Sequence, residues 1–384
     1  MTKKKIITLV SVIVSIVILL TTGFVVAGVD EKKPNVIELR IKDDHPGLPG
    51  VDLALQAIVY YGEEGNTDRI TAEDYTLSCD VPEVKFDGEK IILPADFKDN
   101  TDLEGFNIYV KHNTDDTVVD SYPLTIKKWE LTNSDEFDGT ELNPDMWSVT
   151  DSTDKEDIGH DKTWGWDKRA VSVKDGSLQI DVLQNDGTGT NDADFISGKV
   201  LAKYSQNEGL FLASIKMPTK GGALNAFWLI PTSETWGKAW FAKVRSGSRD
   251  GMLLGEPDIV EYSPNWKDSN GVPRCAVTDH FWYSDTLELD TGKQYQQWYS
   301  CEKLATDYVD FACAWTPVAF YYYVDGELVK TVKNTESTDE EARMYFTVLK
   351  GGYGDNETKE WAGGFTEADL PTMSFKVDYC RWYK

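Results

Sequence analysis

Two dipeptides that favour tight hairpins constrain the fold of this chain most strongly. Asp175-Gly176 lies within an apolar stretch over residues 170–182, and Asp325-Gly326 lies within a similar stretch over residues 319–332. An Asp-Gly pair between two apolar runs favours a two-residue β-hairpin, because both positions tolerate a positive φ. From residue 129 onward the chain shows no helical periodicity. We therefore predict an antiparallel β-sandwich of about 250 residues.

Further apolar or alternating runs predict the remaining strands. In the second part of the chain they span residues 198–203, 210–217, 309–315, 344–349 and 373–382. In the first part they span residues 36–41, 53–61, 90–93, 106–110 and 122–126. Several short strands within about a hundred residues indicate an immunoglobulin-like sandwich. We predict such a module over residues 30–128, acting as a spacer or a carbohydrate-binding module, ahead of a second domain over residues 129–384.

Residues 1–29 have the composition of an export signal. Three lysines at positions 3–5 precede an uncharged apolar run over residues 6–27, and Val25 with Ala27 suits a signal-peptidase site. The run is also long enough to span a bilayer, so an uncleaved membrane anchor is the alternative. In either case we expect the rest of the chain to lie outside the cytoplasm, as a secreted or membrane-anchored protein.

Charge and residue counts disfavour several classes of partner. The formal net charge is −26, and losing the three lysines of the signal takes it to −29. Nucleic acid, anionic membrane surfaces and heavily sulfated polysaccharides are therefore poor partners, unless a local basic patch intervenes. The five cysteines lack CxxC spacing and the four histidines lack HExxH spacing, which argues against zinc. We expect a monomer without a catalytic metal.

Glu256, Asp258 and Glu261 form an acidic pattern, E-P-D-I-V-E, within a run of strand-forming residues. In a regular strand Glu256 and Asp258 share a face while Glu261 points away. A β-bulge adds one residue, is common beside active sites, and would bring all three onto one face. Since 65 of the 384 residues are acidic, chance supplies about two such patterns. Like charges on one strand face repel each other, however, so this flank favours a functional use.

A series of ordered motifs identifies a resemblance over most of residues 130–384. The motifs are residues 134–140 (SDEFDGT) with Leu142 and Trp147, 195–199 (FISGK), 209–218, 226–231 (AFWLIP), 255–262 (GEPDIVEY), 315–317 (WTP), 323–326 (YVDG) and 375–383 (FKVDYCRWY). Together they resemble glycoside hydrolase family 16, the bacterial laminarinase, lichenase, agarase and carrageenase group. The resemblance implies a concanavalin-like jelly-roll sandwich for the second domain.

The same resemblance implies catalytic roles and an activity. It makes Glu256 the nucleophile, Glu261 the general acid and base, and Asp258 the partner that holds and tunes the nucleophile. Retaining glycosidases need two carboxyl groups roughly 5 to 5.5 Å apart in this way. The implied protein is a secreted, retaining endo-glycosidase that hydrolyses internal β-linkages of a polysaccharide, with β-1,3 or mixed β-1,3-1,4 glucan as the expected substrate.

Departures from the family pattern leave alternatives open. Pro257 replaces an isoleucine and removes a ladder donor, which strands tolerate at an edge or a bulge. Residues 163–170 lack the Asn-Glu-x-Gln-x-Tyr run of laminarinases, and Leu224-Asn225 stands where those enzymes often carry Trp-Pro. An endo-β-galactosidase or agarase-type activity on a galactan or mucin glycan is one alternative. A transglycosylase is another, and so is a non-catalytic glycan-binding protein, although such proteins usually lose one of the two glutamates.

Aromatic side chains provide candidate sugar platforms, since sugars offer apolar ring faces edged with hydroxyls. We predict substrate contacts from six of the residues that lie before or around the acidic strand. They are Trp164, Trp166, Trp228, Trp236, Trp240 and His280. Trp228 would equally suit the core, because Phe227 and Leu229 flank it, and His280 would equally suit a satisfied surface position. The resemblance requires no cofactor but leaves room for a structural calcium ion.

Overall fold

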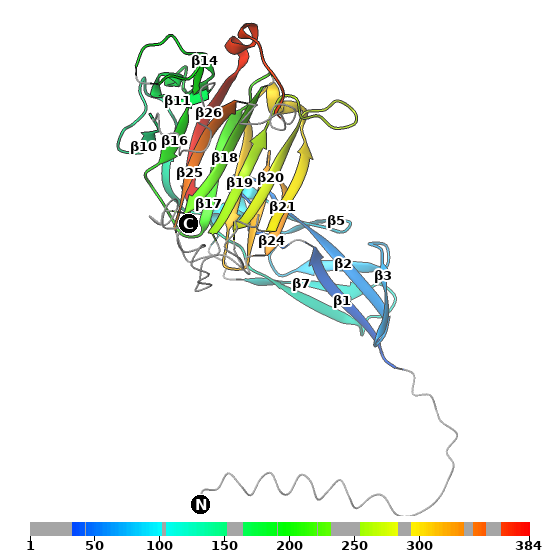
Figure 1. Ribbon diagram of the computed structural model, residues 1–384. Coiled ribbons are helices and arrows are strands. Elements are labelled where there is room, and N and C mark those ends of the chain that lie inside the picture. The colour runs from blue at the N-terminus through cyan, green and yellow to red at the C-terminus, as the bar shows by residue number, and fades with distance from the viewer. Residues whose placement is uncertain are drawn as a thin grey trace, which may run out of the picture.

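The computed structural model describes residues 33–42, 44–101, 105–151, 164–189, 191–220, 222–231, 254–282, 293–333, 341–350 and 362–384. The export signal or anchor predicted over residues 1–29 lies outside these ranges. Strands dominate the described chain, and nearly every strand pair is antiparallel (Figure 1). Within these ranges no helix is long and apolar enough to cross a membrane.

The first part of the chain folds into two sheets around one core. Its elements are β1 (Asn35–Lys42), β2 (Leu53–Glu63), β3 (Asn66–Ile70), β4 (Tyr75–Cys79), β5 (Lys85–Asp87), β6 (Lys90–Leu93), α1 (Ala95–Asn100), β7 (Phe106–His112) and β8 (Val119–Leu124). One sheet has the order β1-β2-β6-β5, with β3 paired to β2, and the other has the order β4-β7-β8. The five strands predicted here are confirmed, and β3, β4 and β5 were missed.

The second part forms a sandwich of two large sheets. The first sheet has the order β10 (Trp147–Val149), β16 (Lys199–Ala202), β25 (Ala342–Lys350), β18 (Ala223–Pro231), β19 (Leu254–Tyr262), β20 (Arg274–Trp282) and β21 (Lys293–Ser300). The second sheet has the order β12 (Val171–Lys174), β13 (Ser177–Asp181), β26 (Ser374–Tyr383), β17 (Gly209–Lys216), β22 (Val309–Trp315), β23 (Ala319–Val324) and β24 (Glu327–Lys333), with β9 (Leu131–Asp135) paired to β26. The predicted antiparallel sandwich is confirmed.

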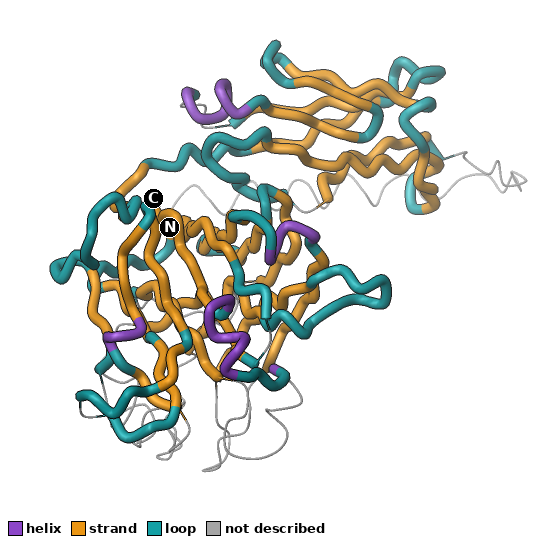
Figure 2. Tube along the Cα trace, turned by 90° about the horizontal axis from the view of Figure 1, so that it is seen from above, coloured by secondary structure: helices purple, strands orange, loops and turns teal. Residues whose placement is uncertain are grey.

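Smaller elements connect these sheets. A minor sheet has the order β11 (Trp164–Trp166), β15 (Phe195–Ser197) and β14 (Leu183–Gln184), and the helical turns are η1 (Lys168–Ala170), η3 (Glu302–Ala305) and η4 (Glu367–Thr372). Figure 2 shows that the helical segments are short and stand in the connections between strands. The scaffold that carries the site is therefore built from strands.

Both predicted hairpins form at their Asp-Gly pairs. Asp175 and Gly176 have φ values of 54° and 71° and join β12 to β13. Asp325 and Gly326 have φ values of 51° and 86° and join β23 to β24. Two consecutive positive φ values are the requirement of the tight turn that matches the twist of paired strands.

Only the first two residues of the motif over residues 134–140 lie in a strand. β9 ends at Asp135, whose Oδ1 accepts a hydrogen bond from the Phe137 amide at 2.9 Å and whose Oδ2 accepts one from Trp147 Nε1 at 2.8 Å. Phe137 has a φ of 50°, which an extended strand does not permit. Hydrogen bonds to the Asp135 side chain therefore take the place of backbone pairing here. Residues 136–140 follow the strand rather than extend it.

A segment before β2 packs on the outer face of the eight-stranded sheet. Trp129 Nε1 donates a hydrogen bond to the Gly47 carbonyl at 2.9 Å, and His45 Nδ1 lies 3.0 Å from the Tyr323 hydroxyl. Leu48 joins Leu210 and other residues of that face in a buried cluster. This contact lies on the sheet opposite the acidic strand, so it leaves the outer face of the seven-stranded sheet available for the site.

Candidate active site

The acidic pattern lies on β19, a central strand of the seven-stranded sheet. On the β20 side Asp258 pairs with Thr278 and Glu261 with Ala276, so three steps along β19 match two along β20. On the β18 side the register shifts between Phe227 and Trp228. An extra residue in one strand of an antiparallel pair is a β-bulge, and the bulge predicted for this strand is confirmed.

The bulge turns two consecutive side chains inward. Ile259 and Val260 are both fully buried and both belong to the core between the sheets. Side chains normally alternate between faces along a strand. Because Ile259 and Val260 share the inner face, Asp258 and Glu261 share the outer one, although three positions separate them.

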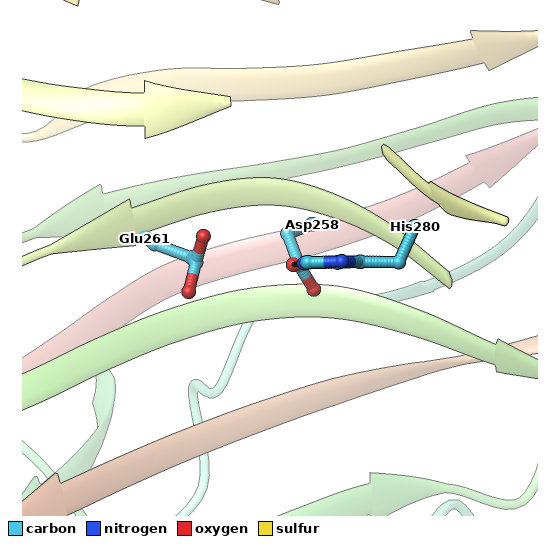
Figure 3. A group of neighbouring side chains, drawn as sticks. All are labelled: Asp258, Glu261 and His280. Carbon is cyan, nitrogen blue, oxygen red and sulfur yellow. Dashed lines mark ion pairs between the residues drawn. The ribbon is translucent and has the colours of Figure 1, made fainter. Parts of the chain in front are cut away.

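Contacts tie Asp258 and Glu261 to neighbouring side chains of β20. His280 Nε2 lies 3.1 Å from Asp258 Oδ2, and Thr278 Oγ1 donates a hydrogen bond to Glu261 Oε2 at 3.0 Å. Figure 3 shows the His280 ring beside the Asp258 carboxyl, with Glu261 further along β19, the strand that carries Asp258. Glu256, which is partly buried, pairs in register with His280. The structure therefore brings the predicted acids and His280 to one face.

Burial and mutual repulsion govern the protonation of these acids. Burial, followed by the charges of Glu261 and Asp279, holds the pKa of Asp258 well above its usual range, and the ammonium of Lys330 opposes this shift. Burial also raises the pKa of Glu261, against the hydrogen bond from Thr278 and the charges of His280 and Lys330. A raised pKa favours the protonated form of a carboxyl, which is the form a general acid needs.

The same three side chains have the spacing of a metal site. Among the described residues, Asp258, Glu261 and His280 each offer one ligand atom, and these atoms lie within 4.8 Å of one another. The Asp258–His280 pair and the Thr278 hydrogen bond already give these atoms partners. We therefore assign no metal to this group and treat it as the acid cluster of the site.

Pro257 fits this strand because it stands next to the bulge. Along β18 the pairing with β19 ends at Trp228 and Asp258, so Pro257 lies one residue beyond that ladder. On the other side it pairs in register with Asp279. A proline without a ladder hydrogen bond is tolerated at a bulge, as the sequence predicted.

Trp228 lies beside the acids on the outer face. It pairs in register with Asp258 on one side and Tyr345 on the other, while Phe227 and Leu229 point into the core. The Trp228 and Tyr345 rings have centroids 4.7 Å apart, and Trp228 Nε1 donates a hydrogen bond to Thr347 Oγ1 at 3.2 Å. These contacts hold a partly exposed indole next to the carboxyls, as a sugar platform requires.

Two other predicted platforms are buried instead. Trp164 and Trp166 are 3% and 2% exposed and belong to the main core. Their rings meet edge to face at 6.2 Å, and β11 pairs with β15 at this point. The prediction that they stack on sugar is therefore corrected, because the minor sheet carries them into the interior. Trp236 and Trp240 lie outside the described residues.

Trp228→Ala is expected to raise KM for a glucan about 10-fold while changing kcat less, because aromatic contacts contribute about 0.5–1.5 kcal/mol. Steady-state kinetics on a soluble glucan measure this. Trp164→Phe is the matched control, since this buried indole should alter stability without altering KM. An unchanged KM in Trp228→Ala would show that Trp228 contacts no substrate.

The sequence reasoning missed several residues of the site. Thr278 bonds Glu261 directly, and Tyr345 supports Trp228 from β25. The sequence held only a weak signal for Thr278, which lies two residues before His280 and so shares a face of one strand with it. Which strand would pair with β19 depended on the topology.

Comparisons with known proteins agree with this fold. No protein-family model matches the chain. The glucan endo-1,3-beta-glucosidase A1 of Niallia circulans is 26% identical over 280 residues, which cover 65% of this chain and 37% of that protein. The beta-glucanase of Rhodothermus marinus is 25% identical over 288 residues, which cover 67% of this chain and 85% of that protein. The chain thus spans little more than a third of the length of the first relative.

Solved structures show the same architecture. The laminarinase from Rhodothermus marinus superposes with a TM-score of 0.52 at 22% identity and covers 67% of this chain and 97% of its own. The endo-beta-1,3-glucanase from Pyrococcus furiosus gives a TM-score of 0.53 at 20% identity, covering 67% of this chain and 94% of its own. A non-specific endo-beta-1,3(4)-glucanase of family GH16 gives 0.52 at 19% identity, covering 67% and 91%.

The fold is therefore the β-jelly-roll sandwich of the laminarinase-type glucanases. At identities of 19–22% these structures show the fold alone, whereas the related sequences support the predicted assignment to glycoside hydrolase family 16. These sequences also support the prediction of a glycoside hydrolase. The immunoglobulin-like assignment of residues 30–128 stays a prediction, because the similarities cover about two thirds of the chain.

Proposed function

We propose that the chain is an endo-acting, retaining glycoside hydrolase that cleaves β-1,3 or mixed β-1,3-1,4 glucan. The observation that carries the proposal is the bulge in β19, which brings Asp258 and Glu261 onto one face beside Trp228. The related sequences are named as a glucan endo-1,3-beta-glucosidase and a beta-glucanase. A bulged strand with crowded carboxyls has little structural benefit, since like charges on one face repel each other.

In the proposed reaction Glu256 and Glu261 act in two steps. The Glu256 carboxylate attacks the anomeric carbon while Glu261 donates its proton to the departing glycosidic oxygen, which gives a covalent glycosyl-enzyme. Glu261, now ionised, removes a proton from water, and this water displaces Glu256 from the same face that the leaving group occupied. The burial that raises the pKa of Glu261 favours the protonated form that the first step uses.

Neighbouring side chains hold this machinery in place. The Thr278 hydroxyl orients the Glu261 carboxyl through its hydrogen bond. Asp258, which lies between Glu256 and Glu261 along β19, contacts His280 of β20, and His280 pairs in register with Glu256. Protons in such a group belong to the set rather than to one residue. We propose that Asp258 shares a proton with this set and so favours the ionised, attacking form of Glu256.

A panel of glycans tests this function on the full chain. Laminarin and lichenan should yield oligosaccharides of several lengths early in the reaction, and NMR should detect the β-anomer as the first product. Cleavage of a galactan or a mucin glycan but of neither glucan would replace this proposal with a galactanase. Binding of glucan without any cleavage would instead establish a glycan-binding protein.

A further inference from the structure

A buried ion pair lies on the core side of β20, the strand that pairs with the acidic strand β19. Lys330 on β24 places its Nζ 2.6 Å from Asp279 Oδ2 on β20, and the Tyr322 hydroxyl on β23 donates a hydrogen bond to Asp279 Oδ1. The Lys330 and Asp279 side chains are only 7% and 2% exposed. Asp279 faces inward, so this cluster lies between the two sheets of the sandwich and joins the site sheet to the opposite sheet.

The cluster holds the part of β20 that touches the catalytic acids. Asp279 stands between Thr278, which bonds Glu261, and His280, which contacts Asp258. Lys330 Nζ also donates a hydrogen bond to the Val277 carbonyl at 3.4 Å. The Lys330 ammonium therefore contacts both sequence neighbours of Thr278, Val277 and Asp279, from the core side of β20. The position of the Thr278 hydroxyl depends on these contacts.

Stability alone gives a poor account of this pair. Two of its neighbours, Val277 and Cys313, are fully buried in the apolar core between the sheets. Moving two charges out of water costs several kcal/mol per ion, and a well-packed apolar pair of similar size is often equally or more stable. The pair must therefore contribute something that apolar side chains would not.

We propose that Lys330, Asp279 and Tyr322 are positioning residues that fix Thr278 and His280 against Glu261 and Asp258 and set the pH range of hydrolysis. This inference rests on the proposed glycosidase function. Lys330 is the residue with the largest expected effect, because its charge acts on both acids from the opposite sheet.

Electrostatics supports this role. The titratable groups that interact with the two acids are Asp279 and His280 on β20, Tyr322 on β23 and Lys330 on β24, and Cys313 on β22 interacts in turn with Asp279 and Lys330. The charge of Lys330 lowers the pKa of both Asp258 and Glu261, whereas that of Asp279 raises the pKa of Asp258. Loss of the Lys330 charge should therefore raise the pKa of Glu261 and keep it protonated at higher pH.

The kinetic test compares Lys330→Met with the wild-type full chain on laminarin. The alkaline limb of kcat/KM against pH should move upward by about one unit. Because Thr278 and His280 lose their support, kcat should fall about 10-fold or more with KM nearly unchanged. Lys330→Arg keeps the positive charge, so its alkaline limb should stay at the wild-type pH. An alkaline limb that stays in place in Lys330→Met would overturn the proposal.

A matched control separates positioning from mere loss of a buried charge. Lys98 in α1 is also fully buried, with its Nζ 2.7 Å from Asp99 Oδ1, and it lies in the first part of the chain. Lys98→Met should lower stability without moving the pH profile. An equal shift in Lys98→Met would contradict the proposal. If Lys330→Met does not fold, Asp279→Leu with Lys330→Met removes both charges, and wild-type kcat and pH profile in that protein would overturn it as well.

A measurement without substrate keeps the two proposals distinguishable. Carboxyl ¹³C NMR of glutamate-labelled protein follows the titration of Glu261, whose signal is the one lost in Glu261→Gln. Lys330→Met should raise the titration midpoint of that signal above the wild-type value. An unchanged midpoint refutes the positioning role even in a chain that cleaves no glycan, whereas absence of cleavage with a raised midpoint refutes only the glucanase proposal.

Discussion

Glu261→Gln is expected to lower kcat on a natural β-glucan by about 10²- to 10⁴-fold, the usual contribution of a general acid. Glutamine keeps the shape of the side chain and its bond from Thr278, but it has no proton of sufficient acidity to give to the leaving oxygen. Glu256→Gln should be at least as damaging, since no covalent intermediate forms. Hydrolysis rates of laminarin measure both losses.

Chemical rescue assigns the two roles. Alanine variants of Glu256 and Glu261 are given an aryl β-glucoside substrate with a good leaving group and azide as an external nucleophile. Azide in Glu256→Ala should give the α-glycosyl azide, because it replaces the nucleophile, whereas in Glu261→Ala it should give the β-glycosyl azide from the covalent intermediate. The reverse pattern of products would exchange the assignments. Glu141→Gln, at an exposed loop position, is the control and should keep full activity.

The same Glu261→Gln change should raise thermal stability at neutral pH. Burial raises the pKa of Glu261, so the folded state binds this proton more tightly than the unfolded chain. The stability that the Glu261 carboxyl contributes is fully present below its pKa in the unfolded chain, about 4.3, and is lost as the pH rises through its pKa in the folded protein. Glutamine stays neutral throughout. The Tm of Glu261→Gln should therefore exceed that of the wild type at pH 7, and the difference should vanish near about pH 4. A lower Tm at pH 7 would contradict the raised pKa of this carboxyl.

Phe346→Ala is expected to lower the free energy of unfolding by about 3–5 kcal/mol, the cost of removing a fully buried aromatic ring. Phe346 on β25 is 0% exposed. Its ring centroid lies 5.0 Å from Phe227, 5.8 Å from Trp147 and 6.2 Å from Phe375. Phe375 belongs to the opposite sheet, so the ring joins both layers beneath the strand that carries Trp228.

Urea unfolding followed by tryptophan fluorescence measures this loss. Val318→Ala is the matched control, because Val318 is apolar but 68% exposed and its truncation should change stability by less than about 0.5 kcal/mol. A loss below about 1 kcal/mol in Phe346→Ala would mean that the sandwich core tolerates the cavity by collapsing around it.

Local rules alone predicted many of the strands and both Asp-Gly hairpins of this protein. The alternating apolar runs gave strands close to their observed bounds, and the Asp-Gly pairs gave both turns, since each depends on residues adjacent in sequence. The bulge at Glu256–Glu261 was also predictable, because the period of two along a strand admits no other way to put these acids on one face.

Contacts between strands and between sheets could not be predicted from the sequence. Trp164 and Trp166 have the composition of a sugar platform, yet pairing with a distant strand buries them. Asp279 and Lys330 are 51 residues apart and meet only because β20 and β24 face each other across the core.

The sequence by itself therefore determined the fold class and predicted the chemistry of the acidic strand, since period, turn residues and carboxyl spacing are local properties. The tertiary structure decided which side chains surround that strand, and so the direction in which the pKa of each acid shifts. Burial and the distance between charges control a pKa, and both are set only when the sheets pack together.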